Sequence, residues 1–183
     1  YDFTLRETQT YEIIEDVSRL KSEIGILYTS SKNEEVILKL LKQNGLKFEP
    51  LVTAKPHVSI CTDHPLAKKS VITLEELEEY PYLSFEQGEY NSFYFSEEIL
   101  STLDRSKNVR VKDRATLSNL IVRLNGYTVS TGMLSKELNG ENIIAKPLAV
   151  DESMQIGIIM QKEMPLSRYG AAYVEYLKGY VGR

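Results

Sequence analysis

The sequence has very few of the residues on which metal and redox chemistry most often depend. Its 183 residues include one cysteine, two histidines and no tryptophan. A single cysteine excludes a disulfide within the chain and fits a reducing compartment. So few histidine and cysteine side chains do not complete a zinc site. We therefore expect no metal, no other cofactor and no internal disulfide.

Long apolar runs and clusters of positive charge are also missing. No stretch approaches the ~18 apolar residues that a membrane-spanning helix needs. The 22 Lys and Arg are spread among 26 Asp and Glu, with a net charge of −4. Nucleic-acid modules depend on clustered cations that displace phosphate counterions. We expect neither a membrane span nor DNA binding by this segment alone.

The first residues, YDFTLRETQT, contain no initiator Met, no basic n-region and no apolar h-region. They are therefore not a signal peptide, and they are typical of the interior of a longer protein. We expect a cytoplasmic location.

Strand-like and helix-like segments alternate along the whole chain. Strands are expected at 1–7, 24–30, 48–62, 81–85, 108–113, 126–132, 142–150 and 154–161. Helices are expected at 8–22, 33–45, 73–80, 92–103, 115–125 and 167–180, with a helical turn at 134–140. This alternation predicts an α/β protein with parallel sheets covered on both faces.

Helix-end signals support several of these boundaries. Asn33 is placed to cap the helix at 33–45, and Gly45 is placed to stop it. Thr73 and Glu76 have the spacing of a capping box. In the helix at 8–22, four apolar side chains recur at helical spacing and predict its buried face: Tyr11, Ile14, Val17 and Leu20.

The segment CTDHPLAKK (61–69) holds the only cysteine and one of the histidines. A catalytic Cys–His pair needs contact between the two groups and a third group that orients the base. Three residues of extended chain separate Cys61 from His64 by about 10 Å. We favour a packing role for Cys61 and a turn role for His64 over a nucleophilic pair, so no catalytic residue and no metal ligand is expected.

Four tyrosines recur at helical spacing near the end of the chain: Tyr169, Tyr173, Tyr176 and Tyr180. Aromatic stripes of this kind are usually packing surfaces. We favour docking of this stripe onto a sheet over a role as a binding platform.

Hydroxyl-rich and polar clusters follow four of the expected strands: YTSS (28–31), SFEQG (84–88), KDRAT (112–116) and STG (130–132). In open parallel sheets, ligands bind at the carboxyl ends of strands, where helix N-termini offer free N–H groups. The clusters therefore indicate a site for a small polar or anionic molecule. The alternative is that each hydroxyl only caps the helix that follows.

An ordered series of motifs resembles the effector-binding domain of LysR-type transcriptional regulators. EIGIL (23–27) follows a helix, HPLA (64–67) is followed by LEEL and YPYLSF, and VRLNGYTVSTG (122–132) precedes KPLAV. The resemblance covers essentially all of the chain. It implies two Rossmann-like lobes, similar to type 2 periplasmic binding proteins, which are joined by two crossing segments and bind the effector between them.

The resemblance places the first lobe at residues 1–61 plus 155–183 and the second at 62–154, with one crossing in the segment 61–69. It implies a first strand and helix, and a winged helix-turn-helix DNA-binding region, upstream of Tyr1. The implied effector-binding residues are Thr29, Ser30, Ser84, Phe85, Gln87, Asp113, Arg114, Ser130 and Thr131. Arg114 would pair with an acidic effector, and Asp113 would either orient it or cap the next helix. A surface position for Arg114 is the alternative.

The implied function is sensing of a small-molecule effector, without catalysis, in a transcription regulator. The implied assembly is a homodimer or homotetramer that forms head to tail, with the helix at 115–125 at the contact, and that binds DNA only through the upstream region. Two alternatives share the fold. A solute-binding protein for transport would carry a signal peptide upstream, and an enzyme similar to prephenate dehydratase would need a reactive polar cluster in the cleft.

Overall fold

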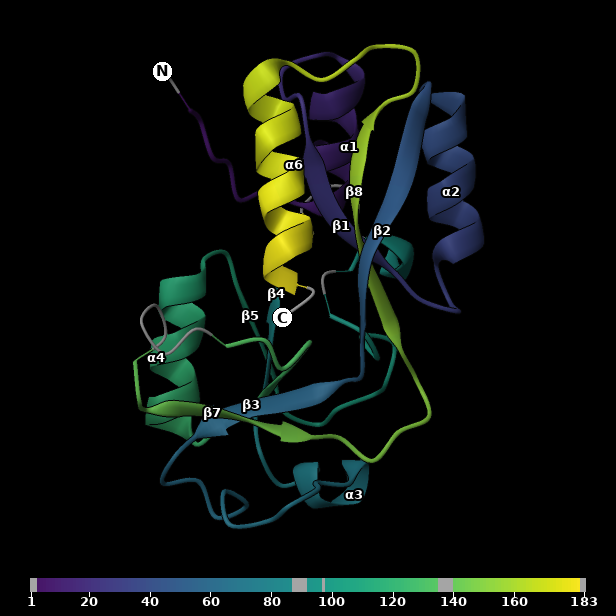
Figure 1. Ribbon diagram of the computed structural model, residues 1–183. Coiled ribbons are helices and arrows are strands. Elements are labelled where there is room, and N and C mark those ends of the chain that lie inside the picture. The colour runs from purple at the N-terminus through teal and green to yellow at the C-terminus, as the bar shows by residue number, and fades with distance from the viewer. Residues whose placement is uncertain (1–2, 87–91, 97, 135–139, 182–183) are drawn as a thin grey trace. The chain divides into compact units, whose positions relative to one another are not determined.

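The computed structural model describes residues 3–86, 92–96, 98–134 and 140–181 (Figure 1). The chain divides into two compact units. The first contains Tyr1–Thr53, Gln87–Phe95 and Gln155–Arg183, and the second contains Ala54–Glu86 and Ser96–Met154. The chain enters the second unit between Thr53 and Ala54, so the segment 61–69, where the crossing was expected, lies inside the second unit.

The first unit has a three-stranded sheet with the order β1-β8-β2. Its elements are α1 (Thr10–Ser18), β1 (Gly25–Thr29), α2 (Glu34–Gln43), β2 (Leu46–Ala54), a 3-10 turn (Phe93–Phe95), β8 (Met154–Gln161) and α6 (Arg168–Val181). Strands β1 and β8 are antiparallel, with Gly25 opposite Ile159 and Thr29 opposite Gln155.

Helices cover both faces of this sheet. Ile159 of β8 packs with α1 and α2 in a cluster that includes Val17 and Ile37, whereas Ile158 packs with Val174 of α6 in another. Successive residues of a strand point to opposite faces of the sheet, so these adjacent isoleucines pack against the helices on opposite faces. Both isoleucines have no exposed surface, and burial of each contributes about 1.5–3 kcal/mol.

The second unit combines antiparallel and parallel strands. Its elements are β3 (His57–Cys61), α3 (Leu74–Leu77), β4 (Tyr82–Phe85), β5 (Asn108–Val111), α4 (Arg114–Leu124), β6 (Thr128–Ser130) and β7 (Ile143–Pro147). Strand β3 pairs antiparallel with β6 and β7, and β4 pairs parallel with β5. A parallel bridge between Tyr82 and Tyr127 connects the β4–β5 pair to the sheet of β6, β3 and β7, on the β6 side of that sheet.

The α/β class is therefore confirmed, but the expectation of parallel sheets is wrong for the β1–β8, β3–β6 and β3–β7 pairs. These pairs join segments that are far apart in the sequence and are not successive strands of one strand–helix–strand unit. Their direction is consequently not set by the crossover that makes neighbouring strands parallel.

The core of the second unit lies between α4 and the strands. Leu117 and Ile121, one helical turn apart, pack against Leu83, Val111 and Cys61. Spacing of four residues puts both side chains on one face of the helix. This packing places the N-terminus of α4 directly after β5.

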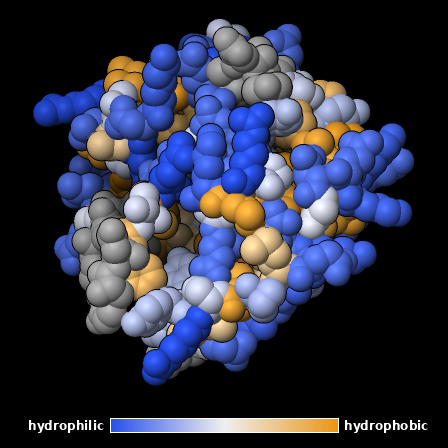
Figure 2. Space-filling view, turned by 90° about the horizontal axis from the view of Figure 1, so that it is seen from above, coloured by the Kyte–Doolittle hydropathy of each residue, from blue (hydrophilic) through white to orange (hydrophobic). Residues whose placement is uncertain are grey.

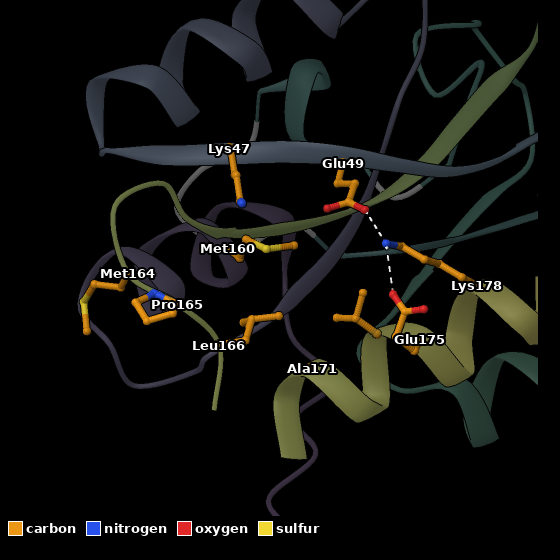
Figure 3. A pocket seen from close by; sticks show the side chains of 10 residues that line it. Lys47, Glu49, Met160, Met164, Pro165, Leu166, Ala171, Glu175 and Lys178 are labelled. Carbon is orange, nitrogen blue, oxygen red and sulfur yellow. Dashed lines mark hydrogen bonds and ion pairs between the residues drawn. The ribbon is translucent and has the colours of Figure 1, made fainter. Parts of the chain in front are cut away.

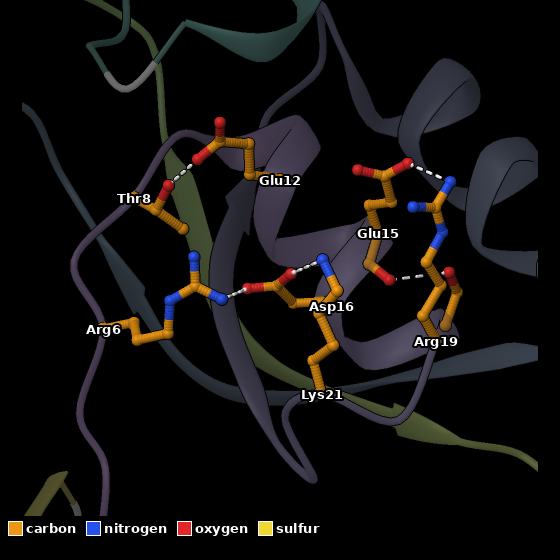
Figure 4. Close-up of polar contacts among 8 residues, drawn as sticks. Arg6, Thr8, Glu12, Glu15, Asp16, Arg19 and Lys21 are labelled. Atoms are coloured by element: carbon orange, nitrogen blue, oxygen red, sulfur yellow. Dashed lines mark hydrogen bonds and ion pairs between the residues drawn. The ribbon is translucent and has the colours of Figure 1, made fainter.

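Residues 3–7 do not form the strand expected at 1–7, whose first two residues lie outside the described part of the chain. Residues 3–9 have no regular structure, and Leu5 is 87% exposed. The segment is held instead by side chains: Arg6 binds Asp16 of α1, and Thr8 donates to Glu12 (Figure 4). Within the described residues no strand pairs with the segment, and an alternating pattern alone does not supply the hydrogen-bond ladder that a strand needs.

Several helix ends agree with the sequence, and two do not. Thr73 and Glu76 form the expected capping box, and Gly45, with φ of +69°, follows the end of α2. Asn33 precedes α2 but makes no side-chain cap. Leu20, expected on the buried face of the first helix, lies beyond its end and is 57% exposed.

The helix expected at 92–103 is also wrong in the described residues, which form a 3-10 turn at Phe93–Phe95 and further turns from Ile99. Two local features interrupt a helix here. The Glu98 carboxylate accepts a hydrogen bond from the Phe85 N–H at 2.7 Å, and Leu100 has a φ of +65°. The helical turn expected at 134–140 lies largely outside the described residues.

Candidate functional site

The polar groups at the carboxyl end of β1 are buried and hydrogen-bonded to one another. Thr29 and Ser30 are 2% and 8% exposed. The Asn33 Oδ1 accepts from the Ser30 N–H at 2.7 Å, and the Asn33 Nδ2 donates to the Tyr94 carbonyl at 3.3 Å. Asn33 therefore holds the turn that presents Thr29 and Ser30. Sequence reasoning identified Asn33 only as a helix cap.

In the second unit, three of the predicted clusters lie along one edge. Strand β5 is parallel to β4, with Val111 opposite Phe85. The parallel bridge between Tyr82 and Tyr127 gives β6 the same direction as β4. The strands β5, β4 and β6 thus end at the same edge, where Arg114, Phe85 and Ser130 follow or terminate them. This is the arrangement that a strand-end ligand site requires.

Phe85 and Arg114 are brought together at this edge. The guanidinium carbon of Arg114 lies 5.9 Å from the centre of the Phe85 ring, within the range of a cation–π contact. Arg114 is exposed and occupies the first position of α4. Ser84, which precedes Phe85, is 7% exposed and its Oγ lies 3.5 Å from the Asn108 Oδ1. The charged group thus faces solvent while the serine supports the strand.

Asp113 caps α4. Its carboxylate accepts from the Thr116 backbone N–H at 2.8 Å and from the Thr116 hydroxyl at 2.7 Å. Both hydrogen bonds lower the pKa of Asp113, because they stabilise its ionised form. The bond from the backbone N–H of Thr116 has the larger effect. Of the two predicted roles, the structure shows the helix cap.

Ser130 and Thr131 form a small hydroxyl group at the end of β6. The Ser130 Oγ lies 2.9 Å from the Ser59 Oγ and accepts from the Gly132 N–H at 3.2 Å. Thr131 accepts from the Met133 N–H at 3.3 Å. A Cβ on Gly132 would lie 2.5 Å from the His57 ring, so only glycine fits beside that ring. Ser59 was missed because its partner, Ser130, comes from another strand.

Of the nine predicted residues, Thr29 and Ser30 belong to the first unit, and the other described members belong to the second. Within the second unit, Phe85 lies against Arg114, and Ser130 lies against Ser59. Gln87 lies outside the described residues.

Cys61 and His64 have the structural roles that the sequence favours. His64 is 3% exposed; its Nδ1 accepts from the Leu66 N–H at 3.1 Å, so its Nε2 carries the proton and donates to the Asn125 carbonyl at 3.1 Å. The Cys61 thiol donates to the Asn125 Oδ1 at 3.4 Å. Asn125 has a φ of +48° and ends α4. Burial lowers the pKa of His64 because it disfavours the charged ring.

Neither a metal site nor a membrane span is found in the part of the chain that the structure describes. No group of three His, Cys, Asp or Glu side chains there could hold a metal ion. None of the described helices has the length and apolarity needed to cross a bilayer. On the face shown in Figure 2, hydrophilic side chains predominate and hydrophobic ones form small groups between them.

A groove of about 320 Å³ lies between β2, β8 and α6 of the first unit (Figure 3). Its apolar lining includes Met160 and Val174. At one end the Lys178 Nζ lies 2.6 Å from Glu49 and 3.4 Å from Glu175, which raises the pKa of Lys178, chiefly through the Glu49 hydrogen bond. At this end of the groove the three charges pair with one another. It was not predicted, because it joins residues from distant parts of the sequence.

The expected docking of the tyrosine stripe onto a sheet is wrong. Tyr169, Tyr173, Tyr176 and Tyr180 are 51%, 40%, 71% and 63% exposed. Val174 of α6 packs against Ile158 and Met160 of β8 instead, and Gly170 is buried beside Glu23.

The chain belongs to the LysR substrate binding domain family, whose pattern it matches over residues 2–182. This domain is the ligand-sensing part of transcription regulators. The family thereby supports the regulator interpretation over the transport and dehydratase-like alternatives. No curated protein matches the chain.

Solved structures show the same fold. The effector-binding domain of QuiR in complex with shikimate is 19% identical, with a TM-score of 0.65, over 96% of this chain and 79% of that one. The oxidized form of OxyR is 19% identical, with a TM-score of 0.65, over 99% and 82%. HinK, a LysR family regulator from Pseudomonas aeruginosa, is 15% identical, with a TM-score of 0.64, over 96% and 58%. The chain therefore spans about three-fifths of HinK.

Proposed function

We propose that this domain senses a small polar or anionic metabolite and thereby controls DNA binding by a cytoplasmic, non-enzymatic regulator. The observation that carries the proposal is the shared edge of the second unit, where β5, β4 and β6 end together beside an exposed Arg114. An arginine fork suits a carboxylate or a phosphate. QuiR is solved with shikimate and BenM with its effector benzoate, and both of these ligands are carboxylic acids.

In the proposed site, Arg114 pairs with the anionic group of the effector. Phe85, beneath the guanidinium, supplies an apolar surface, and Ser130 and Thr131 supply hydroxyls. Asp113 fixes the N-terminus of α4, whose free N–H groups favour negative charge. Ser84 supports the edge, Gln87 is its proposed neighbour, and Thr29 and Ser30 are the proposed contribution of the first unit.

The two units are the proposed lobes, and the two crossing segments are proposed at Thr53–Ala54 and Met154–Gln155. The division of the chain also assigns Gln87–Phe95, within the second unit's sequence, to the first unit. An effector regulates only through its different affinity for two lobe arrangements. Converting a 1:99 ratio of arrangements to 99:1 takes about 5.5 kcal/mol. A ligand of micromolar affinity has about 8 kcal/mol of binding free energy, which is sufficient if it binds one arrangement far better.

The regulator is also proposed to carry, upstream of Tyr1, a winged helix-turn-helix region and the first strand and helix of the domain. In support, β1 is an edge strand of the described sheet, and edges of this kind need to be covered or paired. Intact-mass analysis and N-terminal sequencing of the natural gene product test this part. A secretion signal upstream would contradict it.

Assembly is proposed to be a homodimer or homotetramer with head-to-tail contacts through α4. Val122 and Leu124 of this helix are 41% and 45% exposed, and exposed apolar residues on one helix suit such a contact. Val122→Glu should then reduce the assembled fraction in light scattering of the full-length protein.

The effector can be found by a thermal-shift screen of amino acids, sugar acids, aromatic acids and inorganic anions. A ligand at about 100 times its dissociation constant adds about 2.7 kcal/mol of stability, which gives a clear shift. For an anionic hit, Arg114→Ala should weaken binding about 10-fold or more, because a charged hydrogen bond is lost.

The matched control is Arg123→Ala, which removes the same charge at the other end of α4. Equal affinity of the Arg114→Ala and Arg123→Ala variants would remove Arg114 from the site. Turnover of any candidate metabolite would contradict the non-enzymatic part of the proposal.

A further inference from the structure

His57 is the first residue of β3 and lies at the edge where β5, β4 and β6 end, because β3 runs antiparallel to β6. It is opposite Ser130 in this pair of strands. Residues directly opposite one another have their Cβ atoms about 4.5–5.5 Å apart on one face of the sheet. The partly exposed imidazole of His57 and the hydroxyl of Ser130 are therefore neighbours at the proposed effector site.

The face of the sheet that carries His57 is the one that α4 covers. Alternate residues of a strand share a face, so His57 and Cys61 point the same way. Cys61 packs in one cluster with residues of α4, and the Phe85 ring beside Arg114 packs against that cluster. Strand β6 lies between β3 and β4, so two strand spacings, about 10 Å, separate His57 from Phe85. A small molecule bound at Arg114 can thus also reach His57.

Two contacts fix the ring of His57. Its Nδ1 lies 2.8 Å from the carbonyl oxygen of Lys55, which can only accept, so Nδ1 carries the proton of the neutral ring. Gly132 lies against the ring so closely that a Cβ there would be 2.5 Å from it. The His57 Nε2 is consequently an acceptor, and within the described part of the chain no hydrogen bond reaches it.

The Ser130 hydroxyl supplies a donor beside this acceptor. Its Oγ accepts from the Gly132 N–H at 3.2 Å and lies 2.9 Å from the Ser59 Oγ. A hydroxyl has one proton and two acceptor positions. When Ser59 donates to Ser130, both acceptor positions of Ser130 are filled and its own proton is available to a ligand. The edge then presents one acceptor and one donor side by side.

We propose that His57 and Ser130 together bind a hydroxyl group of the effector, and that the effector is therefore a hydroxy acid. The ligand hydroxyl donates to the His57 Nε2 and accepts from the Ser130 Oγ, while the carboxylate of the ligand pairs with Arg114. A hydroxyl fits this pair because it donates and accepts at a single oxygen atom. The inference rests on the proposed function, since it assigns a second group of the same ligand.

The test compares acids that differ by one hydroxyl group. The chain is titrated in a calorimeter with malate and succinate, lactate and propionate, and 3-hydroxybenzoate and benzoate, and with any acidic hit of the thermal-shift screen beside its deoxy analogue. The hydroxylated member of a pair that binds should bind about 10- to 100-fold more tightly. Its deoxy analogue leaves the acceptor of His57 and the donor of Ser130 without a partner.

Variants at the two positions should abolish this preference. His57→Phe keeps an aromatic ring beside Gly132 but removes Nε2, and Ser130→Ala removes the donor. Each should lower the ratio of the paired affinities about 10-fold or more and leave the affinity for the deoxy acid unchanged. A role in folding alone would change both affinities equally, so the ratio separates ligand contact from structural support.

Two further variants sharpen this comparison. His57→Gln has an amide oxygen that can accept a hydrogen bond, so it should retain part of the preference for the hydroxylated acid. His64→Gln is the matched control. It replaces the other histidine, which binds Asn125 at the far end of α4, and should leave the ratio unchanged.

Three results would overturn the inference. They are equal affinities within every pair that binds, a preference that both His57→Phe and Ser130→Ala leave intact, and a natural effector without a hydroxyl group. In each case Arg114→Ala could still weaken binding, and the proposed function would stand. A chain that binds none of these acids and no anion of the screen would contradict the proposed function itself.

Discussion

The helices α2 and α4 both follow a strand that ends in a predicted ligand-binding cluster, yet they begin differently. Asp113 caps α4 with its own carboxylate and leaves Arg114 exposed beside it. Asn33, the equivalent position before α2, is 5% exposed and binds the strand end and Tyr94 instead. The difference shows that the strand end of the second unit exposes an arginine at the start of its helix, whereas that of the first unit is held by the hydrogen bonds of a buried asparagine.

The largest expected effect is at Asn33. Asn33→Ala leaves the buried Ser30 N–H and the part-buried Tyr94 carbonyl without that partner, and an unsatisfied buried group costs about 1–3 kcal/mol. Urea unfolding should show the loss as a lower midpoint. The control is Asn44→Ala on the exposed end of the same helix, which should cost only a few tenths of a kcal/mol. Equal losses for both variants would contradict a special role for the first turn.

An intermediate effect is expected from His64, which supports the far end of α4. Its pKa in the folded chain is below the ordinary value of 6.5, because burial disfavours the charged ring. The unfolded chain therefore takes up a proton first as the pH falls, and stability is lost from about pH 7 downward. The loss is complete below the folded pKa.

Unfolding free energies measured between about pH 5 and 8 check this prediction. His64→Gln should flatten that part of the profile. A profile in which stability rises as the pH falls through this range would show that the sign of the shift is wrong.

The smallest effect is expected at the exposed cap. The pKa of Asp113 is lowered by the two hydrogen bonds from Thr116, so its contribution is present above the unfolded pKa of a carboxyl and is lost as the pH falls through the folded value. Asp113→Asn keeps a helix-capping side chain but removes this dependence of stability on pH at acidic pH. Unfolding curves near pH 3 and pH 7 distinguish the two proteins, and parallel curves would exclude the carboxylate as the titrating group.

Much of the local structure was predictable, because it depends on residues that are close in the sequence. The capping box at Thr73–Glu76, the end of α2 at Gly45 and the structural roles of Cys61 and His64 are confirmed. The strand ends that carry Phe85, Arg114 and Ser130 were also recognised. Their common edge was expected only from the general rule for parallel sheets.

The rest depends on contacts between distant segments. The antiparallel partners of β8 and β3, the side-chain anchoring of residues 3–9 and the second partner of Asn33 all involve chain far away in the sequence. The tyrosines of α6 illustrate the same limit, since their spacing indicates a shared face but not whether anything covers it.

The sequence by itself determined the α/β class, the family and the positions of most helices, since turn residues and apolar periodicity act within a few residues of one another. The tertiary structure alone decided which strands pair, which polar groups are buried, and that the tyrosines of α6 are exposed. Burial and pairing are properties of segments that meet only after folding, and their free energy depends on the partner as much as on the residue itself.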